Sequence, residues 1–167
     1  MRHRSTALPL ALCAAALVLY ASLYPFEGWR WPPGLDLVSV AALPWPTYSS
    51  RFDDWTNALG YMPLGALVYG AGVRGGSRAW PALLAAAVLP TLLSASVEVA
   101  QQFLPERVPS LKDLVLNAAG ASAGALLAAA VQSTGWVDRW QALREGWFAR
   151  DSALALLLLL LWPVALL

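Results

Sequence analysis

Four stretches of about twenty mostly apolar residues divide this chain, and they constrain its fold more than any other feature. A helix of about this length can cross a bilayer, because its backbone hydrogen bonds are all satisfied within the segment. The predicted spans are residues 7–24, 54–73, 79–103 and 113–134. A fifth apolar run, 152–167, is short for a span, and we interpret it as the truncated start of a further helix. The predicted fold is therefore an all-α, polytopic transmembrane helix bundle with four full spans and a partial fifth.

The composition also indicates a membrane protein whose main partner is the lipid bilayer. Hydrophobic residues make up 59% of the chain and charged residues 13%, whereas soluble domains average about 25% charged residues. Many of the nine tryptophans flank the apolar runs, as aromatic residues do at membrane interfaces. A net charge of +1 gives no indication of a nucleic-acid partner. The single cysteine, Cys13, excludes a disulfide within the chain.

The distribution of basic residues predicts the orientation of the chain. With the N-terminus in the cytoplasm, seven arginines lie inside and four basic residues lie outside, as the positive-inside rule favours. The start of the second span, the end of the third and the start of the fourth then meet on the outer side. Residues 1–134 form the predicted transmembrane domain. An amphipathic interfacial helix over 135–151 follows it, because Trp136, Trp140 and Trp147 share one helical face.

Polar residues that are unusual inside a membrane helix gather at these outer ends. They lie at helical spacings that place neighbours on one face, as Asp113 and Asn117 do. An ionised group at the bilayer centre costs roughly 2.5–3.5 kcal/mol, so such groups usually pair with one another or with a ligand. The candidate binding residues are Asp54, Asn57, Tyr61, Glu98, Gln101, Arg107, Ser110, Asp113 and Asn117.

The short link 104–111 makes the third and fourth spans antiparallel neighbours. We therefore expect Glu98, Gln101, Asp113 and Asn117 to converge, with Arg107 above them or folded onto a carboxylate. A structural role is the alternative, because side-chain hydrogen bonds between membrane helices are each worth about 0.6–2 kcal/mol. Asp54, Ser110 and Asp113 also suit helix starts.

Other motifs either restrict the chemistry or concern packing. The GxxxG pair of Gly120 and Gly124 predicts close contact with another helix. No histidine lies in or near the polar residues, so no metal site is predicted. No nucleotide fingerprint or glycine-rich phosphate loop is present, so no cofactor is predicted.

Two motifs carry a resemblance to a known family. DWTNALGYMPLG at 54–65 and SxxVExxQxFLPERxxSxxDxxxNxxGxxxG at 94–124 resemble the VanZ-like membrane protein family, with SLYPF at 22–26 also fitting. The resemblance implies a multi-pass protein of the bacterial inner (cytoplasmic) membrane, linked by the family's name to resistance to teicoplanin-type glycopeptide antibiotics. It supplies no established biochemical activity. Many members carry histidine where this chain has Asn57, and longer members continue into further hydrophobic sequence, as 152–167 would.

Three functions fit these features. The first is a non-enzymatic module that binds an envelope component, a lipid-linked molecule or a glycopeptide at its outer face, with the tryptophan-rich segment 25–53 as an apolar lid. The second is an intramembrane enzyme acting on a lipid-linked envelope precursor, with Glu98 and Asp113 as candidate catalytic carboxylates in different environments. The third is a proton-coupled transporter in which Glu98 carries the proton, and its few helices would require an oligomer. We predict the first, because the sequence contains no nucleophile–base set.

Overall fold

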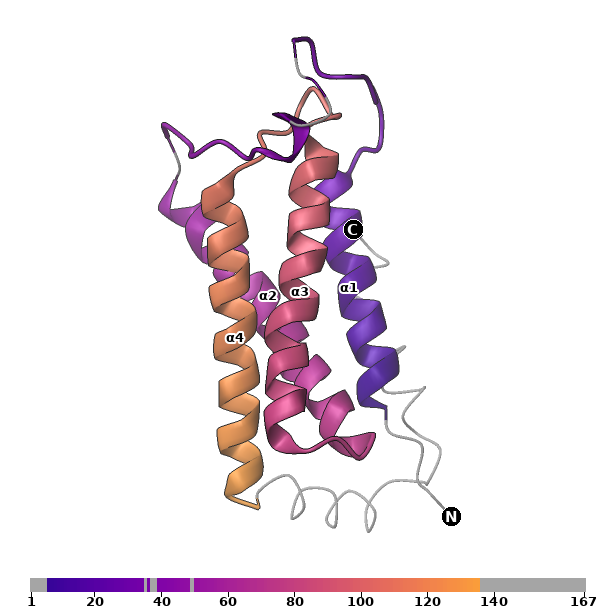
Figure 1. Cartoon of the computed structure of the whole chain (residues 1–167), viewed down its shortest axis with the longest axis vertical. Coiled ribbons are helices and arrows are strands. Elements are labelled where there is room, and N and C mark those ends of the chain that lie inside the picture. Colours follow the sequence, from indigo (N-terminus) through magenta and orange to yellow (C-terminus); the bar gives the residue numbers. More distant parts are fainter. Residues whose placement is uncertain (1–5, 35, 37–38, 49, 136–167) are drawn as a thin grey trace. The chain divides into compact units, whose positions relative to one another are not determined.

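The computed structural model describes residues 6–34, 36, 39–48 and 50–135. Within these residues the chain is all-helical and contains no strand. Its elements are α1 (Ala7–Leu23), the 3-10 turn η1 (Ser39–Ala41), α2 (Arg51–Arg74), α3 (Ala79–Gln101) and α4 (Leu111–Ser133) (Figure 1). The all-α prediction is confirmed for the described part, since the four helices begin and end within a few residues of the four apolar stretches. Apart from Gly135, the predicted interfacial helix 135–151 and the segment 152–167 lie outside the described residues.

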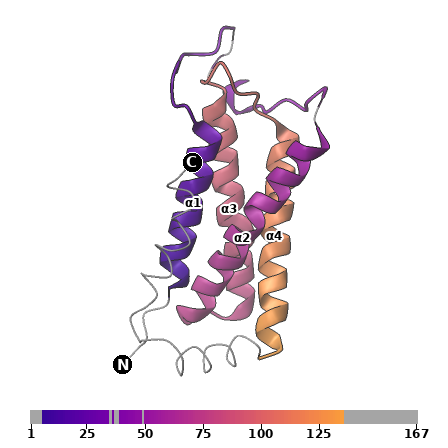
Figure 2. The ribbon, with the colours of Figure 1, turned by 180° about the vertical axis from the view of Figure 1, so that it is seen from behind.

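The chain divides into two compact units between Ala129 and Ala130. The first unit holds α1, α2, α3 and most of α4. In this unit α1 contacts both α2 and α3, and α2 crosses α3 and α4 at an incline (Figure 2). The segment after α1 and the α3–α4 link lie at one end, whereas the turn between α2 and α3 lies at the other (Figures 1 and 2). The bundle therefore has one end that carries both of its longer connections.

Glycines allow α2 and α4 to meet backbone against backbone. A Cβ added at Gly120 would lie 1.9 Å from the carbonyl oxygen of Ala58, and one added at Gly124 would lie 1.9 Å from that of Met62. Real Cβ atoms essentially never approach another atom this closely, so only glycine fits at either position. The GxxxG prediction of close packing is confirmed, and the partner helix is α2.

Small side chains fill the interior, and large apolar ones cover the outside. Ala82, Ala86 and Ala121 are at most 1% exposed. Only 33% of the most apolar stretch of α3 and 28% of that of α4 are buried, which is little for the core helices of a soluble protein. Both helices are long and apolar enough to cross a membrane. The exposed apolar residues on the helices include Leu8, Leu12, Leu84, Val88, Leu92, Leu126 and Leu127.

Candidate functional site

The buried carboxylate of Glu98 lies at the start of α4. Its Oε2 accepts a hydrogen bond of 2.8 Å from the backbone nitrogen of Ser110, and the residue is only 3% exposed. Ser110 caps α4, because its Oγ accepts a 3.2 Å hydrogen bond from the backbone nitrogen of Asp113. In a capping box, the residue at the Asp113 position would itself accept from the N–H of the capping residue. Here Glu98 of α3 supplies that acceptor, and its negative charge suits the positive end of the α4 dipole.

Asp113 turns instead toward α2, where its carboxylate is a hydrogen-bond partner of the Asn57 side chain. The preceding residue, Lys112, forms an ion pair with Asp54, with Nζ 2.7 Å from Oδ1 and 2.9 Å from Oδ2. The two side chains of this pair are 25% and 28% exposed, so we expect it to contribute no more than about 1 kcal/mol. Together the two contacts join the polar ends of α2 and α4.

A deeper group of polar side chains lies one helical turn further into the bundle. Asn117 Nδ2 donates a 2.9 Å hydrogen bond to the Oγ of Ser94, and both residues are buried. The hydroxyl of Tyr61 lies close to Ser94 and Glu98. Within the described residues, the Asn117 Oδ1 has no hydrogen-bond partner, although it is buried.

These residues form one continuous cluster between α2, α3 and α4, which we call the polar seam. The structure thus brings together seven of the nine candidate residues, and it adds Ser94 and Lys112. The polar seam comprises Asp54, Asn57, Tyr61, Ser94, Glu98, Ser110, Lys112, Asp113 and Asn117.

Gln101 and Arg107 bind a different element, the end of α1. Gln101 Nε2 donates a 3.0 Å hydrogen bond to the carbonyl oxygen of Ser22. Arg107 Nη2 donates to the carbonyl oxygens of Ala21, at 3.2 Å, and of Tyr24. The last carbonyls of a helix have no partner inside it and carry the negative end of its dipole. Of the two placements expected for Arg107, the one folded onto a carboxylate is not formed, because these carbonyls accept its hydrogen bonds. Gln101 likewise bonds to α1 and not to the other candidate residues.

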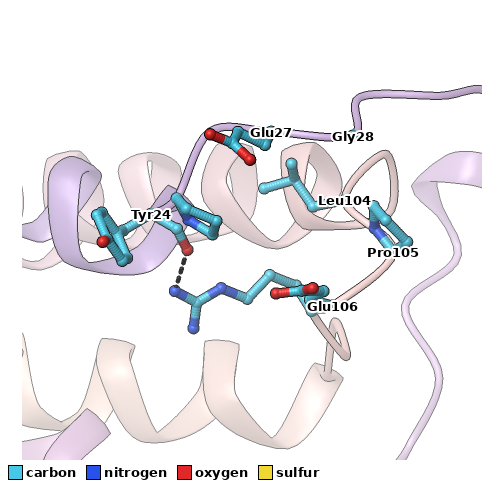
Figure 3. A pocket seen from close by; sticks show the side chains of 8 residues that line it. Tyr24, Glu27, Gly28, Leu104, Pro105 and Glu106 are labelled. Atoms are coloured by element: carbon cyan, nitrogen blue, oxygen red, sulfur yellow. Dashed lines mark hydrogen bonds between the residues drawn. The ribbon is translucent and has the colours of Figure 1, made fainter.

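A pocket of about 210 Å³ opens at this end, between the turn after α1 and the α3–α4 link (Figure 3). The dashed line in Figure 3 marks the hydrogen bond that the Tyr24 carbonyl accepts from Arg107. Ligand pockets commonly measure about 300–1,000 Å³, so this one has room for a headgroup or a side chain but not for a large ligand. The lining residues are Tyr24, Pro25, Glu27, Gly28, Leu104, Pro105, Glu106 and Arg107.

Backbone hydrogen bonds and an aromatic contact join the segment between α1 and α2 to the α3–α4 connection. The backbone nitrogen of Arg30 donates a 3.0 Å hydrogen bond to the carbonyl of Phe103, and that of Leu111 donates a 2.9 Å bond to the carbonyl of Pro44. Trp31 packs edge-on against Phe103, with 5.4 Å between the ring centroids. The segment therefore covers the end of the bundle at which the pocket and the polar seam begin.

Some residues of these sites were not among the sequence-based candidates. Ser94 lies one helical turn before Glu98 on the same face, and that spacing was the available signal. Lys112 reaches Asp54 across 58 positions of sequence, and no local pattern indicates such a pair. Glu27 and Glu106 are exposed residues of irregular segments, where no periodicity marks a functional side chain.

Comparisons with curated proteins and with solved structures gave no match. The model of the VanZ/LLP1 family does match, over residues 8–132. The matched region includes nearly the whole of all four helices, together with the polar seam and every residue that lines the pocket. The chain therefore belongs to the VanZ/LLP1 family.

Proposed function

We propose that this chain is a multi-pass protein of a bacterial inner membrane that binds the headgroup of an envelope lipid, or of a lipid-linked envelope component, at its outer end. In this proposal α1 to α4 are four spans with the N-terminus in the cytoplasm, and the segment 152–167 begins a fifth. The observation that carries the proposal is the pocket of about 210 Å³, which combines two carboxylates and a guanidinium in a recess of headgroup size.

The surroundings of the pocket support a location at the membrane surface. Tyr24, Phe26, Trp29 and Trp31 expose between 43% and 55% of their surface at this end. Tyrosine and tryptophan favour the layer of lipid headgroups, because one part of each side chain is apolar and another can hydrogen-bond. The large apolar side chains on the outside of the helices suit the hydrocarbon layer below.

The charges in the pocket suit a headgroup that carries both an amine and an anionic group. The carboxylates of Glu27 and Glu106 can accept hydrogen bonds from an ammonium. Arg107 donates to the end of α1 through Nη2, and its Nη1 and Nε make no hydrogen bond with a described residue. These two donors are therefore available to an anionic oxygen such as that of a phosphate. A phosphoethanolamine headgroup has this combination of charges.

The environment of Glu98 and Asp113, the candidate catalytic carboxylates, favours a binding protein over an enzyme. Glu98 is 3% exposed and accepts a hydrogen bond from the start of α4, and Asp113 is a partner of Asn57. Neither of them lines the pocket, and among the described residues no serine, cysteine or histidine does so. A substrate held in the pocket would therefore meet neither the predicted carboxylates nor a common nucleophile.

The test is lipid binding by the purified protein in nanodiscs, measured by native mass spectrometry with phosphatidylethanolamine, phosphatidylcholine and phosphatidylglycerol. We expect the ethanolamine lipid to bind most tightly. The double variant Glu27→Gln/Glu106→Gln should lose about tenfold in affinity for it, which corresponds to about 1.4 kcal/mol. Asp53→Asn, which removes an exposed acid outside the pocket, should bind like the wild type. Equal affinity in the double variant, or no preference among lipids, would contradict the proposal.

A further inference from the structure

We infer that the polar seam binds one monovalent cation, held between α2, α3 and α4 at the carboxylate of Glu98. This site is separate from the outer pocket, and it does not depend on headgroup binding. It rests on two observations in the interior of the bundle, a buried carboxylate without a counter-charge and a buried amide oxygen without a partner.

The first observation concerns the charge of Glu98. Among the described residues, its carboxylate makes one hydrogen bond, to the backbone nitrogen of Ser110, and no ion pair. The charged side chain that acts on it is Asp113, which is also acidic. Lys112 is paired with Asp54, and Arg107 donates to the end of α1. Burying a lone ionised carboxylate is strongly unfavourable, so a positive charge beside Glu98 would stabilise this arrangement.

The second observation concerns the deeper polar side chains of the seam. Tyr61 and Asn117 are each only 4% exposed; the Tyr61 hydroxyl lies beside Ser94, whereas the Asn117 Oδ1 has no hydrogen-bond partner in the described part of the chain. The amide nitrogen of Asn117 is already bonded to Ser94, which leaves its oxygen as the unused group. Buried polar groups are nearly always paired. The unpaired Oδ1 of Asn117, on an amide that is bonded to Ser94 one helical turn from Glu98, therefore indicates a bound ion or molecule.

The side-chain atoms available as ligands indicate which class of ion would bind. They are oxygens only, from the carboxylate of Glu98, the amide of Asn117 and the hydroxyls of Ser94 and Tyr61. Oxygen ligands suit hard cations. Glu98 brings a single negative charge, which a singly charged ion such as Na⁺ or K⁺ balances. Among the described residues there is no group of three or more His, Cys, Asp or Glu that could hold a multivalent metal.

Polar groups of the seam lie on one side of this site, and apolar groups lie on the other. Outward from Glu98, polar groups continue through Asn57 and Asp113 to the partly exposed pair of Asp54 and Lys112. On the opposite side of Tyr61, the bundle interior is closed by a cluster that includes Leu64 and Ala121, both at most 3% exposed. A site with one polar entrance favours binding of an ion rather than its conduction through the bundle.

The experiment uses the full chain purified in detergent and its thermal unfolding midpoint. NaCl or KCl is titrated at constant ionic strength, with choline chloride as the replacement salt. We expect a saturable rise of the midpoint with Na⁺ or K⁺. In Glu98→Gln this rise should disappear, because the negative charge is lost while the side-chain oxygen of the introduced glutamine can still accept from Ser110. Asn117→Ala should increase the concentration needed for half of the rise at least fivefold, and Asp53→Asn should respond like the wild type.

Direct binding of ²²Na⁺ or ⁸⁶Rb⁺ to the wild-type protein gives a readout that does not depend on how the variants fold. Saturable uptake of one ion per chain supports the inference. If neither alkali cation binds, or if both salts leave the midpoint at its value in choline chloride, a proton or a water molecule occupies the site and the inference fails. Retention of the full salt response in Glu98→Gln would also overturn it.

Discussion

Replacing Gly120 with alanine should force α2 and α4 apart. The added Cβ would lie 1.9 Å from the carbonyl oxygen of Ala58, whereas ordinary contacts begin at 3.4 Å. Neither atom can move away by a side-chain rotation, because the Cβ is bonded directly to the backbone of α4 and the oxygen is part of the backbone of α2. The helices must therefore separate by roughly 1.5 Å in a close-packed interior. Overpacking of this kind costs about 1–3 kcal/mol. At about 2–4 °C per kcal/mol for a chain of this size, the unfolding midpoint should fall by roughly 2–12 °C.

A matched control lies in α2 itself. A Cβ added at Gly60 meets nothing within 4 Å, and alanine is favoured over glycine inside a helix by roughly 0.5–1 kcal/mol. Gly60→Ala should therefore be at least as stable as the wild type. Both variants can be compared by scanning fluorimetry in detergent and by size-exclusion chromatography after heating. A wild-type midpoint for Gly120→Ala, or an equal loss in Gly60→Ala, would show that α2 and α4 do not meet at Gly120.

Three other outcomes test the contacts at the end of the bundle that carries the pocket. Ser110→Ala removes the side-chain oxygen that caps α4, and it should lower stability by about 1 kcal/mol in the same fluorimetry assay, with Ser110→Asn restoring most of the loss. Arg107→Met removes the side-chain donor to the carbonyls of Ala21 and Tyr24, so proteolysis near Tyr24 should become faster, and Arg107→Lys should restore part of the protection. In a Cys13→Ala background, Glu106→Cys should react with an impermeant maleimide on intact cells, whereas Ser77→Cys should react only after permeabilisation; the reverse pattern would invert the proposed orientation.

The positions of the helices were predictable because each coincides with an apolar run of about the length that a membrane span requires. The polar seam was partly predictable for a related reason. Helical spacing places Asp113 and Asn117 on one face of α4, and a short link brings that face to α3. The start of α4 differs slightly from the prediction, since the cap at Ser110 begins the helix at Leu111 rather than at Asp113.

The partners of individual side chains were much less predictable. Arg107 lies in a connection without periodicity, and its acceptors are backbone carbonyls, which every residue of every helix possesses. The GxxxG motif likewise indicates a face that can pack closely, but the identity of the opposing helix depends on the whole arrangement. Pairings of this kind follow from the tertiary structure and leave no local trace in the sequence.

Because Glu98 caps α4, the number of residues in the α3–α4 connection cannot change without breaking this contact. Surface connections usually tolerate insertions and deletions. Here the chain must return from Glu98 to Ser110 so that the carboxylate lies 2.8 Å from the backbone nitrogen. If one inserted residue were absorbed by starting α4 one position earlier, every later side chain of the helix would rotate by about 100°. Asn117 and the glycines would then leave their partners, so a single-residue change of length in this exposed connection should disrupt packing deep in the bundle.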